Sequence, residues 1–281
     1  MAKILFDIPV AHEPADWADT HLVMEVSPHI FSYAILGREK KVLQLRFYEM
    51  DARNNQELAE ELRGIIVADE ILNAERQKET FVYNFPESQL VPEKYFNENT
   101  GQDLIELLNG DFNRGVTLSE RVEGRQQYNV FRVPAGVHKL LRDNFANGEY
   151  RHYYSLWIQY SQKQADERAN RLSAMFYPNH ILVAAVKDNE LHLLQSYEYQ
   201  AAEDVGYYLL NICGQLQLSP EDTPVILSGM IDVSSALYTE IFKYFARVEM
   251  EQYSGAKPAP VLQDYPAHFF LPLMKLAVCV S

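Results

Sequence analysis

The length, composition and charge of this chain predict a folded, acidic protein without a nucleic-acid partner. Its 281 residues are 47% hydrophobic and 23% charged, which is enough apolar surface for one large domain or two of ordinary size. The formal net charge of −14 repels nucleic acids and anionic membrane surfaces, and no run of lysine and arginine supplies a local basic patch.

Neither end of the chain has the pattern of a membrane segment. Residues 1–17 lack the apolar core of a signal peptide. The longest apolar run, Phe269 to Val280, is interrupted by Pro272 and Lys275 and is shorter than the ~20 residues that cross a bilayer. We therefore expect no membrane insertion, and a cytoplasmic location follows by elimination. The two cysteines are expected to form neither a disulfide framework nor a metal-binding pair.

After a polar lead-in over residues 1–20, the first half of the chain begins with patterns typical of strands. Leu22 to Val26 and Phe31 to Leu36 are apolar runs joined by Ser27-Pro28-His29, where proline favours a turn. Val42 to Tyr48 alternates apolar and polar residues, which indicates a third, half-buried strand. Periodicity then predicts a helix over Gln56–Leu72 and a strand over Phe81–Phe85.

The middle of the chain alternates predicted helices and strands. The expected elements are a short helix from Leu90 to Phe96, a helix over Gln102–Asn109, a loop over Gly110–Gly124, a strand over Tyr128–Val133, a helix over Ala135–Phe145, a strand over Tyr150–Tyr154 and a long helix over Leu156–Met175. Strands that alternate with helices predict an α/β protein with helical crossovers.

The second half restarts at Pro178 with a shorter version of the same element order. The expected elements are a hairpin of Ile181–Val186 and Glu190–Tyr199 around an Asp188-Asn189 turn, a helix over Glu203–Leu216, a strand over Pro224–Leu227, a helix over Ser234–Phe245 and a strand over Val248–Tyr253. The predicted organisation is a lead-in over residues 1–20, a first subdomain over 21–177 and a second over 178–281.

Three short motifs carry a resemblance to a known family. They are Leu90-Val91-Pro92 with Tyr95-Phe96, Glu203-Asp204 followed by Tyr207-Tyr208-Leu209-Leu210, and Leu227-Ser228-Gly229. With them the chain resembles a small family of uncharacterised bacterial proteins assigned an actin-like ATPase fold, over about residues 20–280. The resemblance implies two ribonuclease-H-like subdomains in an actin-like arrangement, with mixed sheets flanked by helices and a cleft between the subdomains.

In active proteins of the actin-like class, a turn in each half holds phosphates with glycine and aspartate, so the resemblance names candidate cleft residues here. Glu25 stands where the first aspartate would be, and Ser27 follows it without a glycine. In the second half, Asp188 lies in the hairpin turn, and Ser228-Gly229 ends a strand where an adenosine-side loop would lie. Each candidate also has a plain interpretation: a surface residue for Glu25, an ordinary hairpin turn for Asp188, and a tight strand-to-helix turn for Gly229.

Three functions remain open from the sequence. The first is a non-catalytic actin-like binding or assembly module without a cofactor, whose protein partner binds an exposed apolar patch near Tyr207-Tyr208 or Tyr150–Tyr160. The second is an ATPase or small-molecule kinase that binds ATP and Mg²⁺, with Glu25 in place of the metal-orienting aspartate. The third, a nuclease, needs a cluster of carboxylates, and the relevant strand supplies only Glu25. The turns lack the glycine and aspartate pattern that holds phosphates, and this favours the first function.

Overall fold

The chain forms two compact units in a computed structural model that describes residues 2–9, 17–38, 41–76, 78–110, 115–145, 147–163, 168–252, 265–266 and 268–280. The first unit comprises Met1–Lys163 and Leu273–Ser281, and the second comprises Gln164–Pro272. The change between units therefore comes before the predicted boundary at residue 177, and the end of the chain belongs to the first unit rather than to the second. We describe each unit by itself.

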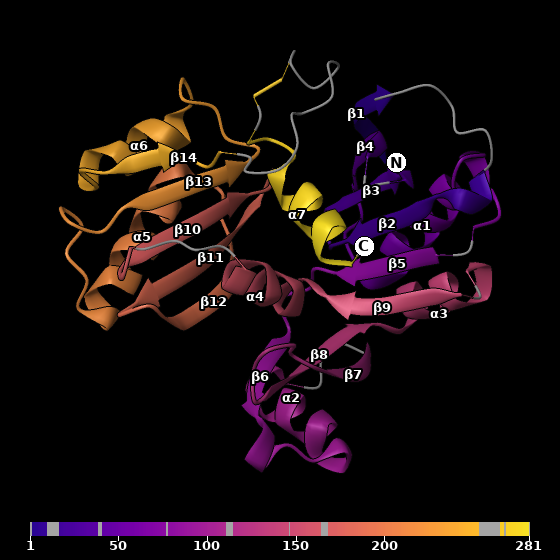
Figure 1. The fold of residues 1–281 in the computed structure, drawn as a ribbon, viewed down its shortest axis with the longest axis horizontal. Helices are drawn as coiled ribbons and strands as arrows, with labels where there is room; N and C mark the ends of the chain where they lie inside the picture. Colours follow the sequence, from indigo (N-terminus) through magenta and orange to yellow (C-terminus); the bar gives the residue numbers. More distant parts are fainter. Residues whose placement is uncertain are drawn as a thin grey trace. The chain divides into compact units, whose positions relative to one another are not determined.

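A six-stranded mixed sheet forms the centre of the first unit (Figure 1). Its strands are β1 (Lys3–Pro9), β2 (His21–Val26), β3 (Ile30–Leu36), β4 (Val42–Glu49), β5 (Lys78–Tyr83) and β9 (Gly148–His152), in the order β1-β4-β3-β2-β5-β9. The strands from β1 to β2 are antiparallel neighbours, whereas β2, β5 and β9 run parallel. Strand β1 lies in the predicted lead-in, which is therefore part of the sheet.

The second unit repeats this topology with five strands and two helices. They are β10 (Arg171–Phe176), β11 (His180–Lys187), β12 (Glu190–Glu198), α5 (Ala202–Leu216), β13 (Val225–Gly229), α6 (Ala236–Tyr244) and β14 (Val248–Met250). The sheet order is β12-β11-β10-β13-β14, which matches β4-β3-β2-β5-β9 strand for strand. Three antiparallel strands followed by two parallel ones, with helical crossovers, form a ribonuclease-H-like unit, and the predicted α/β fold class is confirmed.

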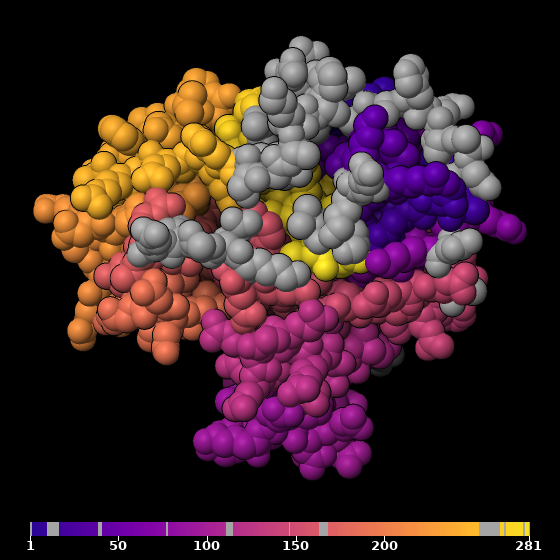
Figure 2. Space-filling view, viewed as in Figure 1, coloured from indigo at the N-terminus to yellow at the C-terminus, as the bar shows by residue number. Residues whose placement is uncertain are grey.

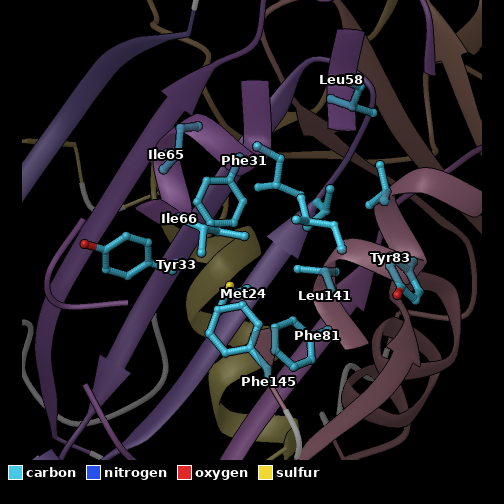
Figure 3. Packing of buried hydrophobic residues seen from close by; sticks show 14 of the residues in the cluster. Met24, Phe31, Tyr33, Leu58, Ile65, Ile66, Phe81, Tyr83, Leu141 and Phe145 are labelled. Carbon is cyan, nitrogen blue, oxygen red and sulfur yellow. The ribbon is translucent and has the colours of Figure 1, made fainter. Parts of the chain in front are cut away.

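The core of the first unit lies between the sheet and two helices, α1 (Asn55–Ala68) and α3 (Ala135–Asn144). Asn54 caps α1 by accepting hydrogen bonds from two backbone N–H groups of the first turn. Figure 3 shows Ile65 and Ile66 of α1 beside Phe31, and Leu141 of α3 near Phe81. Every residue of β2 is buried, as expected for a strand that is covered on both faces.

An insertion between β5 and α3 forms a separate lobe of the first unit (Figure 2). It contains β6 (Ser88–Pro92), the short helices Glu93–Tyr95 and Glu98–Thr100, α2 (Gly101–Asn109), β7 (Gly115–Arg121) and β8 (Gln127–Pro134). Two predictions are wrong here. The helix expected from Leu90 begins as strand β6, and the loop expected over 110–124 contains β7. Strand β7 forms a hairpin with the next strand, β8, in which Leu118 pairs with Phe131.

The long helix predicted over Leu156–Met175 is also wrong. Helix α4 covers Tyr153–Lys163, and β10 then begins at Arg171. Strand β10 pairs with the next strand, β11, on one side and with β13, about 50 residues away, on the other, so its conformation depends on partners outside its own segment. The apolar run at the end of the chain forms α7 (Leu271–Val280), and the carbonyl of Val280 accepts a hydrogen bond from Lys78 at 2.8 Å. No helix among the described residues is long and apolar enough to span a membrane.

Candidate functional site

The turns that follow β2 in the first unit and β10 in the second correspond to one another, and the strand register identifies them. Val26 at the end of β2 pairs with Phe31, and Phe176 at the end of β10 pairs with Ile181. The turn equivalent to Ser27-Pro28-His29 is therefore Tyr177-Pro178-Asn179. The predicted correspondence with Asp188-Asn189 is wrong by one strand, because that turn joins β11 to β12.

In the first unit, the turn after β2 uses its own polar groups to close on itself. Ser27 is fully buried, and its N–H donates to the carbonyl of Ile30 at 2.9 Å. The N–H of Ile30 donates back to the Ser27 Oγ at 2.9 Å. Pro28 has no N–H. The N–H groups of Ser27 and Ile30 are therefore already hydrogen-bonded within the turn, and Pro28 has none to offer a phosphate.

The second unit has the same turn with different side chains. The N–H of Tyr177 donates to the carbonyl of His180 at 2.9 Å, and the two rings stack with centroids 4.5 Å apart. Pro178 occupies the position of Pro28. The residues that follow β5 and β13 also make equivalent hydrogen bonds. The N–H of Asn84 donates to the carbonyl of Val26, and the N–H of Met230 donates to the carbonyl of Phe176. The proline turn is thus repeated in both units at the residue level. This repeat is missed when the first turn is compared with Asp188-Asn189.

Glu25 is buried, not a surface residue as the plain interpretation of the sequence had it. No part of it is exposed, and its Oε1 accepts a hydrogen bond of 2.8 Å from the Nδ2 of Asn84. Its cross-strand neighbours are Ser32 of β3 and Val82 of β5. The equivalent position in the second unit holds Met175, which pairs with Ser228 of β13. A carboxylate therefore stands near the end of β2, and a thioether stands at the equivalent position of β10.

Ser228 and Gly229 lie at the end of β13, and the fold itself explains the glycine. Gly229 has a φ of 82°, and a Cβ there would overlap the carbonyl oxygen of Phe176 on the neighbouring strand. Ser228 is buried, and its Oγ has no hydrogen-bond partner among the described residues. The plain interpretation of Gly229 as a glycine required by backbone geometry therefore has direct structural support.

Asp188 lies at the other end of the same sheet. Asp188 and Asn189 have φ values of 52° and 65°, which are typical of a two-residue hairpin turn. The N–H of Asp188 donates to the Oδ1 of Asn170 at 2.9 Å, just before β10. Gly229 lies beside the opposite end of β10, so the length of that strand, about 20 Å, separates the two positions. The structure brings Glu25 and Ser27 together, and Ser228 and Gly229 together, but it does not place Asp188 beside either pair.

Sequence reasoning missed a buried polar cluster around Asp69, the residue that ends α1. One oxygen of Asp69, Oδ2, accepts from the Tyr33 and Tyr48 hydroxyls at 2.8 and 3.1 Å and from Arg46 at 2.8 Å. Arg46 also forms a two-point ion pair with Asp7 of β1. Burial, with Asp69 nearby, raises the pKa of Tyr33 well above its usual value and that of Tyr48 to about 12. Because tyrosine, arginine and aspartate are far apart in the sequence, no local spacing signals this cluster.

A second missed group surrounds His152, at the end of β9. Its Nε2 donates to the carbonyl of Phe85 at 3.1 Å, and its Nδ1 accepts from the N–H of Tyr154 at 3.2 Å. These partners fit a neutral ring. Burial lowers the pKa of His152 to about 3, and the hydrogen bond to Phe85 opposes that shift only in part. Among the described residues, no group of three or more His, Cys, Asp and Glu side chains is arranged to hold a metal ion.

We expect His152 to make the protein less stable in acid. The unfolded chain binds a proton at about pH 6.5 and the folded chain does not until about pH 3, so stability falls as the pH drops between these values. From pH 7 to pH 5 this residue contributes a loss of about 2 kcal/mol. Urea denaturation at both pH values measures it. His152→Gln should shrink the difference, whereas His192→Gln, at an exposed position on β12, should keep it. An equal difference in both variants would contradict the assignment.

With this geometry in view, comparison with known proteins places the chain in a family. Residues 12–248 match the family model described as "Protein of unknown function (DUF3822)". The chain belongs to this family. Comparison with curated proteins found no match.

Two solved structures show the fold. A Bacteroides thetaiotaomicron protein with an actin-like ATPase fold and unknown function is 17% identical over 89% of this chain and 97% of its own, with a TM-score of 0.75. A PilM-PilN type IV pilus biogenesis complex is 12% identical over 93% of this chain and 98% of its own, with a TM-score of 0.58. The family member described here therefore has the actin-like ATPase fold that the sequence predicted.

Proposed function

We propose that this protein is a non-catalytic actin-like binding or assembly module whose partner is a protein. The observation that carries the proposal is the closed proline turn after β2 in the first unit and after β10 in the second. A phosphate cradle needs several backbone N–H groups that point at the ligand, with glycine to allow its approach. Here Pro28 and Pro178 remove one N–H from each turn, and the hydrogen bonds of Ser27 and Tyr177 occupy another.

The apolar surface of the second unit supports a protein partner. Tyr207 of α5 is 64% exposed, and Phe242 and Tyr244 of α6 are 58% and 44% exposed. Exposed aromatic residues of this kind are enriched at protein interfaces. The other predicted patch is packed instead, because Tyr153, Tyr154 and Trp157 are buried. That a protein of this fold was solved as a PilM-PilN complex is consistent with a protein-binding role.

The alternative, an ATPase or kinase of the actin-like class, draws on Glu25 with Ser27, Ser228 and Gly229 as its candidate ligand-binding residues. The observation in its favour is the burial of the Glu25 carboxylate at the end of β2, where this class holds a metal-orienting acid. A catalytic Glu25 would contact Mg²⁺ or the attacking water, and its amide variant would lose that role.

Turnover of Mg-ATP separates the two functions. We expect phosphate release by the purified protein to equal that of buffer alone, and Glu25→Gln to leave it unchanged. The matched control is Glu49→Gln, at an exposed glutamate on β4. Turnover in the parent that Glu25→Gln abolishes and Glu49→Gln preserves would overturn the non-catalytic proposal.

A further inference from the structure

A groove of about 610 Å³ opens beside α1 in the first unit. One wall is formed by Ala2 and Ile4 at the start of β1, the other by Gly64, Ile65 and Ala68 of α1. Arg46 and Tyr48 of β4 form the floor. Ile4 is 50% exposed, which is unusual for an isoleucine that stands beside other apolar groups.

The groove lies beside the two helices that cover the central strands of the sheet. Helices α1 and α3 pack against each other, with α1 over β2 and β3 and α3 over β5 (Figure 3). Among the described residues, α1 is the helix that lines the groove beside β4 and β1.

Gly64 has no packing reason within the described residues. It lies in the middle of α1, where glycine costs about 1 kcal/mol relative to alanine, and a Cβ there would meet no atom within 4 Å. Ala68 follows one turn later on the same wall. Two small residues one turn apart let a second helix approach α1 to the 8–10 Å typical of packed helices. A helix docked against α1 would therefore explain why position 64 is a glycine.

The charge around the groove is negative. The guanidinium of Arg46 forms ion pairs with the Oδ2 atoms of Asp7 and Asp69, at 2.7 and 2.8 Å. Glu60 adds a further carboxylate on the α1 side, and its hydrogen bond from the neutral Gln56 leaves its charge in place. An occupant with lysine or arginine beside its apolar face complements this arrangement.

In the part of the chain that the structure describes, the second unit has no equivalent of β1, and a side chain of its own helix packs on the strand equivalent to β4. Tyr197 of β12, the equivalent of β4, stacks on Tyr208 of α5 with ring centroids 4.8 Å apart. Both tyrosines pack against the core of that unit. The strand equivalent to β4 is therefore covered by its own unit in the second half of the chain.

We propose that the α1 groove, defined as the space between α1 and strands β1 and β4, docks an amphipathic helix of a partner protein. The apolar face of that helix packs on Ile4, Gly64 and Ala68, and a flanking lysine or arginine pairs with Glu60. The inference rests on the proposed protein-binding function and names a surface and a partner chemistry for it. It is independent of the nucleotide turns.

A model peptide tests this proposal directly. The probe is a fluorescein-labelled Leu–Lys amphipathic helix of about 18 residues, long enough to be helical when bound. We expect saturable binding by fluorescence anisotropy, at least about tenfold weaker in Gly64→Trp, which fills the groove, and weaker in Glu60→Lys. Gly214→Trp is the matched control, because Gly214 of α5 also has open space at its Cβ. It should bind the peptide as the parent does.

Several results would overturn the proposal. They are no binding of the Leu–Lys peptide, equal binding of a Leu–Glu peptide, and equal affinity in Gly64→Trp and Gly214→Trp when circular dichroism shows both variants folded. Self-association of the protein that Gly64→Trp abolishes would place a second copy in the groove instead. None of these outcomes depends on nucleotide binding, so a failure here is distinguishable from a failure of the non-catalytic function.

Discussion

Replacement of Asp69 with alanine is expected to lower the free energy of unfolding by about 3–5 kcal/mol, the cost of breaking a buried ion pair from one side. The side chain of Asp69 is 4% exposed, and one of its oxygens accepts three hydrogen bonds. Removing it leaves the Tyr33 and Tyr48 hydroxyls without their acceptor. Arg46 loses the buried one of its two carboxylate partners and keeps its ion pair with Asp7, which is partly exposed.

A surface ion pair provides the control for Asp69. Asp19 pairs with Arg38 at 2.7 Å, with side chains that are 56% and 85% exposed. Exposed pairs contribute about 0–1 kcal/mol, so Asp19→Ala should change stability little. Urea denaturation of both variants makes the comparison. A loss below about 1 kcal/mol for Asp69→Ala would show that the cluster is not the tightly packed network described here.

Gly229→Ala is expected to cost about 3 kcal/mol. A left-handed backbone costs a residue with a Cβ about 1–2 kcal/mol, and the overlap with Phe176 forces the backbone to shift at a further cost of similar size. Thermal unfolding should show a fall of several degrees. If Gly229 instead served only to admit a ligand, the alanine variant would keep its stability.

Gly214→Ala is the matched control for Gly229→Ala. Gly214 lies within α5, and an added Cβ meets no atom within 4 Å. Alanine is the better helix former by about 1 kcal/mol, so this variant should be slightly more stable than the parent. A loss of stability in Gly229→Ala together with a gain in Gly214→Ala would show that the backbone requires glycine at position 229 and only tolerates it at position 214. A loss at both positions would contradict this distinction.

Local patterns in the sequence predicted the elements that depend on local chemistry. The strands on either side of Pro28 are apolar runs, and the helix that begins near Gln56 has a clear apolar face. Strand β10 has no such signal, because Leu172, Ala174 and Met175 are good helix formers. Its pairing with β11 and β13 overrides that preference. Because β10 was not predicted, the β11–β12 hairpin was matched to the first hairpin of the chain. Asp188 was therefore assigned to the wrong turn.

The candidate site was harder to predict because its chemistry depends on partners distant in sequence. The carboxylate of Glu25 is accommodated in the core by Asn84, 59 residues away. The proline turns, in contrast, were visible in the sequence as Ser27-Pro28-His29 and Tyr177-Pro178-Asn179. Only the strand register shows that they are equivalent.

Thermal unfolding with and without Mg-ATP tests the central claim most directly. A ligand that binds the folded state at a hundred times its Kd adds about 2.7 kcal/mol, or about 5–10 °C in a protein of this size. We predict no change in the midpoint at millimolar Mg-ATP, because the turns after β2 and β10 each contain a proline without an N–H, and the N–H groups of Ser27 and Tyr177 are already hydrogen-bonded. A clear rise that depends on both magnesium and ATP would contradict the account.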